Sequence, residues 1–151
     1  MRVLVQRVSR AAVTVEGQRV ADIGPGLLLL VGVGRRDTAA ILERLASRCV
    51  NLRIFADDAG RMNRSVHDLG GEILAVSQFT LYGDASSGNR PGFTEAARPD
   101  AAMPLFEKFV SLLADKLGRP IATGRFGADM QVELVNDGPV TLWLEAVPDS
   151  A

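Results

Sequence analysis

The strongest constraint on the fold is one uninterrupted apolar run, Leu27 to Val31, which lies between Gly26 and Gly32. A short apolar run bounded by turn-forming glycines is typical of a strand that is covered on both faces. Such a strand needs a layer of structure on each side. With 151 residues the chain is long enough to supply both layers from one core. We therefore predict a single domain over residues 1–147, followed by a frayed tail at 148–151.

The remaining elements follow from the spacing of apolar residues. An apolar stripe with spacings of four, four and three predicts one helix, which Asp37 or Thr38 can cap and which extends to Leu52. A second helix is predicted from Pro99 to a stop at Gly118. Its apolar face is Phe106, Val110, Leu113 and Leu117. Short β-branched or alternating segments predict strands at 3–8, 13–15, 20–23, 72–81, 130–135 and 140–144. The order is strands, helix, strands, helix, strands, so we predict an α+β fold in which a mainly antiparallel, barrel-like β-layer packs with two main helices.

Composition excludes several classes of protein. Seventeen Lys and Arg against 18 Asp and Glu leave a net charge of −1, which argues against extended binding along a nucleic-acid backbone but allows contact with an RNA end. One Cys and one His exclude a disulfide framework and a zinc site built from those residues. The chain shows no signal-peptide pattern and no apolar run near the ~20 residues that span a bilayer. We expect a cytoplasmic protein with no membrane partner.

Four candidate motifs have simpler structural explanations. Gly32-Val33-Gly34 lacks the third glycine of a dinucleotide loop and is better explained as a turn. Cys49 lies on the apolar helical stripe, as a buried small hydrophobic residue would. His67 could be a general base, but its polar neighbours favour a solvated loop residue. Asp57 to Asn63 lacks the spaced oxygens of a calcium loop, so we predict a hairpin turn there.

The informative stretch is Ser77 to Thr80, where polar side chains end an otherwise apolar strand. An unpaired buried hydroxyl or amide costs ~1–3 kcal/mol, so these side chains must pair or face a cavity. Taken alone, the stretch fits structural pairing and a ligand site equally well. Gly138-Pro139 is also ambiguous by itself, because only ~5–6% of X–Pro bonds in folded proteins are cis. Asp84 to Gly92 is polar and glycine-rich and is predicted to be an exposed loop beside a site.

The chain contains two short sequence motifs about 60 residues apart, Ser77 to Leu81 and then Asn136 to Thr141. Further characteristic stretches run through nearly the whole chain: 6–8 with 11–16, 27–32, 53–55, Gly60 with 62–63, 90–91 with Phe93, 123–126 and 128–130. Together they resemble the D-aminoacyl-tRNA deacylase family, formerly called D-tyrosyl-tRNA deacylases. One departure is Gly92, where the family usually has a small hydroxyl residue.

The resemblance implies a homodimer in which each subunit inserts a Gly–cis-Pro element into its partner's pocket. That element is Gly138-Pro139 by position, and the pocket strand is Ser77 to Thr80, with Ser77, Gln78, Phe79 and Thr80 as the candidate catalytic residues. Phe126 and Met130 match residues that line the pocket for the terminal adenosine and the aminoacyl group. Ala102, at the start of the second helix, matches a residue that lines the same cavity. No cofactor or metal is implied.

The implied reaction is hydrolysis of the ester between a D-amino acid, or glycine mischarged on tRNA(Ala), and the terminal ribose of tRNA. Thr80 is the only family-matched hydroxyl that could attack, and threonine is a weak nucleophile without an adjacent base. We therefore expect water to attack with help from the neighbouring ribose hydroxyl, while Thr80 positions the groups and the N–H groups of Phe79 and Thr80 stabilise the oxyanion. The parallel carbonyls of Gly138 and Pro139 would hold the α-ammonium and exclude an L side chain.

Two other functions remain open from the sequence. A dimeric nucleic-acid-binding protein could keep the same fold without turnover. A metal-dependent hydrolase would need a ligand cluster, which the sequence does not offer.

Overall fold

The apolar run predicted as a doubly covered strand is β3 (Gly26–Gly32), in the middle of the main sheet. The computed structural model of the chain describes residues 1–148. Leu27 and Leu29 point into the core beneath the helices, whereas Leu28 points to the opposite side, into a second apolar cluster inside the curled sheet. All three leucines are fully buried. The prediction of a strand with both faces covered is confirmed.

The main sheet is mixed and nearly closes into a barrel. Its strand order is β2 (Gln18–Ile23), β1 (Arg2–Val15), β3, β6 (Glu72–Ser77) and β7 (Ala122–Thr123), and β8 (Gln131–Glu145) pairs with β1. β1 is antiparallel to its three partners, while β3, β6 and β7 run parallel. Helical crossovers precede β6 and β7 and return the chain in the same direction, which produces the parallel pairs. The expected mainly antiparallel layer is therefore not confirmed.

Two pairs of strands predicted as separate are each continuous. Residues 3–8 and 13–15 belong to the single 14-residue strand β1, because β1 pairs first with β3 and then with β2 and makes no turn between them. Residues 130–135 and 140–144 fall almost wholly within β8, which follows β1 throughout. Gln6 pairs with Thr141 but Val8 with Asn136, so the residues between them bulge out of the ladder.

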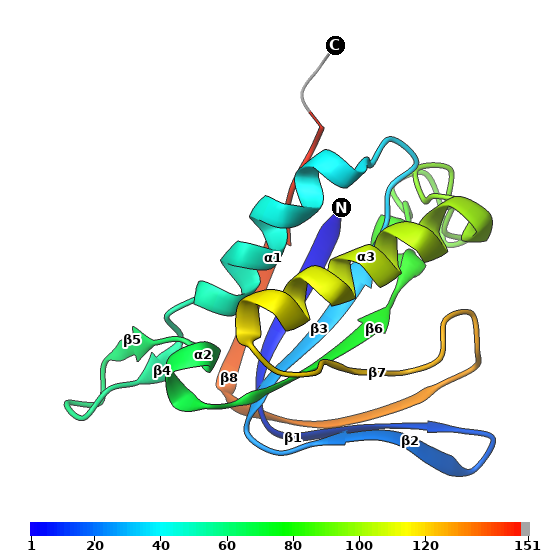
Figure 1. Cartoon of the computed structure of the whole chain (residues 1–151). Coiled ribbons are helices and arrows are strands. Elements are labelled where there is room, and N and C mark those ends of the chain that lie inside the picture. Colours follow the sequence, from blue (N-terminus) through cyan, green and yellow to red (C-terminus); the bar gives the residue numbers. More distant parts are fainter. Residues whose placement is uncertain (149–151) are drawn as a thin grey trace.

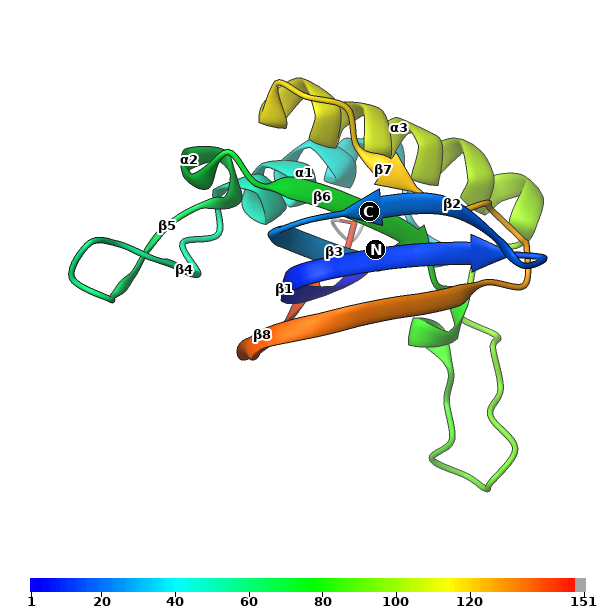
Figure 2. The same cartoon turned by 90° about the horizontal axis from the view of Figure 1, so that it is seen from below.

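Two helices cover one face of the sheet (Figures 1 and 2). After a 3-10 turn η1 (Ala39–Ile41) comes α1 (Leu42–Asn51), and α3 (Pro99–Leu117) ends at Gly118 in the left-handed conformation, as predicted. Of the two predicted caps, Thr38 stands at the N-cap of η1, which leads directly into α1, but its side chain makes no cap bond, and the Asp37 carboxylate instead accepts the N–H of Gly34 at 2.6 Å. On α3 the fully buried side chains are the predicted Leu113 and Phe109, which was not predicted, while the predicted Val110 is only half-buried.

The segment between α1 and β6 forms a small projecting hairpin. β4 (Phe55–Ala56) and β5 (Met62–Arg64) pair through a turn in which Asp57 accepts the N–H groups of Ala59 and Arg61, both at 2.9 Å. The predicted hairpin turn is confirmed. His67 is exposed, but it lies in a short helix, α2 (Val66–Leu69), because Ser65 caps that turn.

Two further predictions can be compared with residues 1–148. Cys49 is fully buried, and burial raises the pKa of its thiol to about 12. The loop from Asp84 to Gly92 is exposed throughout and projects away from the sheet (Figure 2). Of the predicted tail, residues 149–151 lie outside the described residues, and the domain boundary stays a prediction. No helix within residues 1–148 is both long and apolar enough to cross a membrane.

Phe109 and Met103 on α3 allow a matched test of the core. Phe109 is 0% exposed in the main apolar core, whereas Met103 is 43% exposed on the same helix. We expect Phe109→Ala to lower the free energy of unfolding by about 3–5 kcal/mol, because a cavity remains where the ring was. Met103→Ala should change it by less than about 0.5 kcal/mol. Urea unfolding of both variants measures the difference, and equal effects would contradict this assignment of the core.

Candidate active site

The segment from Ser77 to Tyr82 forms an open edge where β6 ends. The strand was predicted to reach Leu81 but stops at Ser77, and the chain then turns into a 3-10 helix, η2 (Phe79–Tyr82). The Gln78 N–H makes the last bond to β3, donating to the Val31 carbonyl at 2.7 Å. The turn that follows leaves Phe79 and Thr80 exposed, while Ser77 and Gln78 are half-buried. The four residues therefore stand together at the carboxyl edge of the sheet, with Phe79 and Thr80 open to solvent.

The Thr80 hydroxyl is held by an amide rather than by a base. The Gln78 side chain donates a short hydrogen bond to Thr80 Oγ1, and among the described residues no other side chain bonds this hydroxyl. A nucleophilic threonine needs a neighbouring group that takes its proton, and an amide cannot do so. The geometry suits a hydroxyl that orients other groups. Within residues 1–148 no three His, Cys, Asp or Glu side chains gather where they could hold a metal ion.

η2 is supported from behind by Arg2. Its guanidinium donates to the Leu81 carbonyl at 3.0 Å and to Glu145 at 2.9 Å, and it lies 4.3 Å from the ring centroid of Tyr82. The bond from Arg2 lowers the pKa of Glu145, and burial raises the pKa of the Tyr82 hydroxyl. Gly34 leaves room for that ring, because a Cβ there would lie 2.6 Å from the Tyr82 oxygen.

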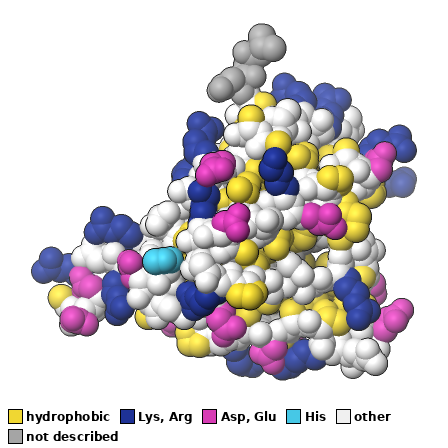
Figure 3. Space-filling view, viewed as in Figure 1, with side chains coloured by type: hydrophobic (Ala, Val, Ile, Leu, Met, Phe, Trp, Pro, Cys, Tyr) yellow, Lys and Arg dark blue, Asp and Glu magenta, His cyan; other side chains and the backbone are white. Residues whose placement is uncertain are grey.

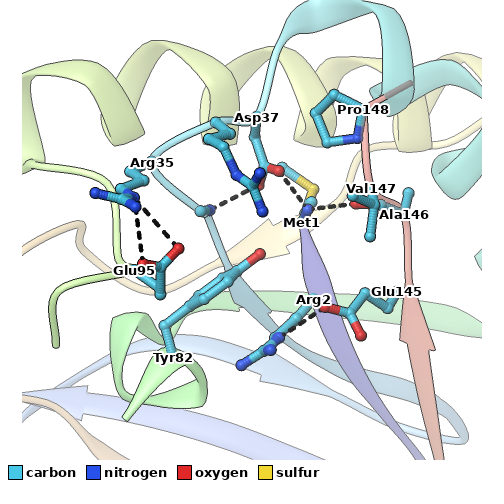
Figure 4. A pocket seen from close by; sticks show the side chains of 12 residues that line it. Met1, Arg2, Arg35, Asp37, Tyr82, Glu95, Glu145, Ala146, Val147 and Pro148 are labelled. Atoms are coloured by element: carbon cyan, nitrogen blue, oxygen red, sulfur yellow. Dashed lines mark hydrogen bonds and ion pairs between the residues drawn. The ribbon is translucent and has the colours of Figure 1, made fainter. Parts of the chain in front are cut away.

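The groups behind η2 line a small charged cavity of about 100 Å³ (Figure 4). The Met1 ammonium lies 2.6 Å from the Asp37 carboxylate and donates to the Ala146 carbonyl at 2.7 Å. Burial lowers the pKa of this ammonium, and the bond to Asp37 opposes the shift. Arg35 pairs with Glu95 at the rim, at 3.0 Å. Because these charges are paired with one another, the cavity serves as support for η2 rather than as a second reactive centre.

Gly138-Pro139 forms the outermost part of the bulge in β8, and its peptide bond is cis. The Asn136 side chain closes the bulge by accepting the Val140 N–H at 2.7 Å and donating to Thr141 Oγ1 at 2.9 Å. Arg7 lies underneath and donates to the Asp137 carbonyl at 2.8 Å. Gly138 has φ 142°, and a Cβ there would lie 2.9 Å from the Val140 nitrogen, so only glycine fits.

One chain does not bring Gly138 and Thr80 together. Ser77 of β6 pairs with Val31 of β3, which in turn pairs with Val3 of β1. Val3 pairs on its other side with Leu144 of β8, whereas the bulge of β8 lies beside Arg7, four residues further along β1. Three strand spacings and four residues of rise separate them by roughly 20 Å. Figure 1 shows the end of β6 and the middle of β8 at opposite corners of the sheet.

The predicted pocket residues fall in the two apolar clusters of the protein. Phe126 packs on the core beneath the helices, with its ring centroid 5.9 Å from that of Phe106, and Ala102 is buried one helical turn before Phe106. Met130 belongs to the other cluster and packs on Gly124, where a Cβ would meet its sulfur at 2.5 Å. Their segment follows β7, which runs parallel to β6 and ends at the same edge.

The sequence assigned no role to several residues that shape the site. Arg2 and Tyr82 carry no motif signal, because their contact joins residues that lie far apart in the sequence. Arg7 and Asn136 stand in matching stretches, but only the structure shows that they hold the bulge. Phe93 also stands in a matching stretch, and its ring packs against Phe79 with centroids 5.0 Å apart.

A family model described as D-Tyr-tRNA(Tyr) deacylase matches residues 4–145. Three similar proteins, each named D-aminoacyl-tRNA deacylase, align over 146 residues, which is 97% of this chain. The protein of Chlorobaculum parvum is 60% identical over 98% of its length. Those of Chlorobium phaeobacteroides and Chromobacterium violaceum are 58% and 56% identical, each over 97% of its length.

Two solved structures share the fold. One, named c-Myc DNA Unwinding Element Binding Protein, has a TM-score of 0.93 and 42% identity over 98% of this chain and 100% of its own. The other, described as a probable eukaryotic D-amino acid tRNA deacylase, has a TM-score of 0.81 and 17% identity over 95% of this chain and 97% of its own, so this likeness shows the fold alone. By the family model and its similar relatives, the chain belongs to the D-Tyr-tRNA(Tyr) deacylase family.

Proposed function

We propose that this protein hydrolyses the ester between a D-amino acid and the terminal ribose of tRNA, releasing the free D-amino acid and tRNA. Family membership supports the reaction. The observation that carries it is the Thr80 hydroxyl, fixed by Gln78 at an open sheet edge beside the Phe126 segment. The enzyme would act in the cytoplasm, where aminoacyl-tRNA is used, and would serve as a proofreading step in translation.

The site is completed by a second copy of the chain. Gly138 lies roughly 20 Å from Thr80 along the sheet of its own subunit, so a site that uses both needs two subunits. Among the described strands β8 pairs only with β1, and its side chains Val135, Leu142 and Trp143 are 40%, 37% and 48% exposed. Apolar side chains on an unpaired edge strand fit a surface that a partner covers. A two-fold dimer would give two equivalent sites, each receiving Gly138-Pro139 from the other subunit.

Hydrolysis in such a site needs little acid–base chemistry. An aminoacyl ester is already reactive, so orientation and stabilisation of the oxyanion supply the acceleration. The first N–H groups of a 3-10 helix have no partner inside it, and in η2 these belong to Phe79 and Thr80. We assign these two N–H groups to the oxyanion. Water attacks with help from the neighbouring ribose hydroxyl, and Thr80 orients both.

Chirality is read by backbone atoms in this scheme. The Gly138 and Pro139 carbonyls of the partner subunit accept hydrogen bonds from the α-ammonium and occupy the space that an L side chain would need. Rejection depends on this clash and not on the identity of the D side chain. Glycine has no side chain to reject, so glycyl esters on tRNA(Ala) are substrates as well.

One rival function is nucleic-acid binding without turnover, which the name of the structural relative with 42% identity favours. A net charge of −1 disfavours extended binding, and Figure 3 shows basic and acidic side chains interspersed on the face that α1 and α3 cover. Incubation with D-aminoacyl-, L-aminoacyl- and glycyl-tRNA separates the two. We expect ester loss with the first and third substrates only. Tight RNA or DNA binding with no ester loss would support the rival function.

Replacing Thr80 tests its positioning role. Thr80→Val removes the hydroxyl at constant shape, and we expect kcat/KM for D-aminoacyl-tRNA to fall about 10- to 100-fold, because the reacting groups lose their alignment. Thr38→Val, the same change at an exposed residue before η1 that makes no side-chain cap bond, serves as the control. Rapid quenching followed by mass spectrometry of the wild-type protein should detect no acyl-Thr80. Accumulated acyl-enzyme would contradict the water mechanism.

Mixed dimers test the shared site. Gly138→Ala should inactivate the dimer, because its Cβ would collide with Val140, and Thr80→Val should weaken it as above. In a refolded one-to-one mixture, half of the dimers are mixed, and each has one site with intact Thr80 and intact Gly138. We expect about a quarter of wild-type activity to return. If each subunit builds its own site, the mixture will show only the average of the two variants.

A further inference from the structure

We propose that Phe79 and Phe93 form a stacking platform for the nucleotide immediately 5′ of the terminal adenosine of tRNA. The inference rests on the proposed function, because it requires the single-stranded end of an aminoacyl-tRNA at Thr80. It assigns to the two rings a binding role that is separate from hydrolysis of the ester. Their ligand would be an unpaired nucleobase of any identity.

Both rings are exposed, although aromatic side chains are mostly buried in folded proteins. Phe79 is 58% exposed and Phe93 is 37% exposed. Their centroids lie 5.0 Å apart with an interplanar angle of 68°, so the edge of one ring meets the face of the other. This edge-to-face contact leaves ring faces open to a base. Phe79 directly precedes Thr80, so the platform lies at the mouth of the candidate active site.

The platform is held firmly although it is exposed. Backbone bonds in both directions between Asp84 and Gly92, each 2.8 Å, close the base of the projecting loop immediately before Phe93. The Phe93 ring packs over Gly83, where a Cβ would lie 3.1 Å from the ring. Gly83 is itself bonded to the Thr80 carbonyl at 2.9 Å. The two rings are therefore fixed relative to Thr80, and little ordering is needed when a base stacks on them.

A single-stranded nucleotide is the occupant that fits this position. Proteins bind unpaired bases by stacking them on aromatic rings, which recognises any base because every base has a π-face. The nucleotide next to the esterified adenosine must leave the site past its mouth, where the rings stand. Arg90, exposed in the adjoining loop, supplies a cation for its phosphate. Figure 2 shows this loop projecting beyond the sheet.

Substrate length tests the platform. Wild-type protein and Phe93→Ala are compared on D-aminoacyl-tRNA and on 3′-D-aminoacyl-adenosine, which lacks the upstream nucleotide. We expect Phe93→Ala to lower kcat/KM about 5- to 100-fold on the tRNA, mostly through KM, and to leave the adenosine ester unchanged. Phe93→Tyr should retain activity on tRNA, whereas Phe93→Leu, apolar but without a π-face, should not. Met103→Ala, which removes another exposed apolar side chain, is the control.

Inhibition gives a second readout. The dinucleotide cytidylyl-adenosine should inhibit the wild-type protein more strongly than adenosine does, and Phe93→Ala should abolish that difference. If Phe93→Ala lowers kcat/KM equally on the tRNA and on the adenosine ester, the two rings contact the terminal adenosine and the proposal is overturned. An unchanged kcat/KM on both substrates would also overturn it. Dissociation of the Phe93→Ala dimer in sedimentation would instead make the pair a subunit contact. Failure of the wild-type protein to hydrolyse either substrate would contradict the proposed function itself.

Discussion

The long strand β1 is the element on which the rest of the structure depends. One side of it pairs with β8 throughout, and the other side pairs first with β3 and then with β2. Because a one-residue slip would turn the buried side chains of β1, such as Val3 and Val5, away from the core, burial fixes its register, and β1 in turn fixes where the bulge of Gly138 stands and, through β3, where β6 ends. The distance between the two motif segments is therefore a property of the sheet. Rearranging either short segment does not close a separation of roughly 20 Å.

The parts of the fold that the sequence predicted well are those set by local rules. The run from Leu27 to Val31, the stop of α3 at Gly118 and the turn at Asp57 each depend on neighbouring residues. The continuity of β1 and the parallel pairing of β6 were missed, because both depend on partners far away in the chain. The β-propensity of a segment indicates whether it can form a strand, whereas pairing with a neighbouring strand determines where that strand begins and ends.

The candidate site also combines features that the sequence could predict with features that depend on distant contacts. Its motif residues could be located from the sequence, because a polar stretch at the end of an apolar strand and a Gly-Pro pair are local signals. Their supports could not, since Arg2 reaches Leu81 and Arg7 reaches Asp137 across more than half of the chain. Nor could the sequence separate a nucleophilic Thr80 from a positioning one. The bond from the Gln78 amide favours the positioning role that we propose, because an amide orients a hydroxyl but does not activate it.

The proposed filter, which would read only the backbone around the α-carbon, has a consequence for binding. It would accept many side chains because it would contact none of them, so the side chain would supply little binding energy. The energy that holds the ester in place must then come from a part of the substrate that all aminoacyl-tRNAs share. The terminal nucleotides are that part, and they are unpaired, uniform and next to the reacting bond. An exposed pair of fixed aromatic rings beside Thr80 would supply that binding energy, which connects the proposed chirality filter to the proposed platform.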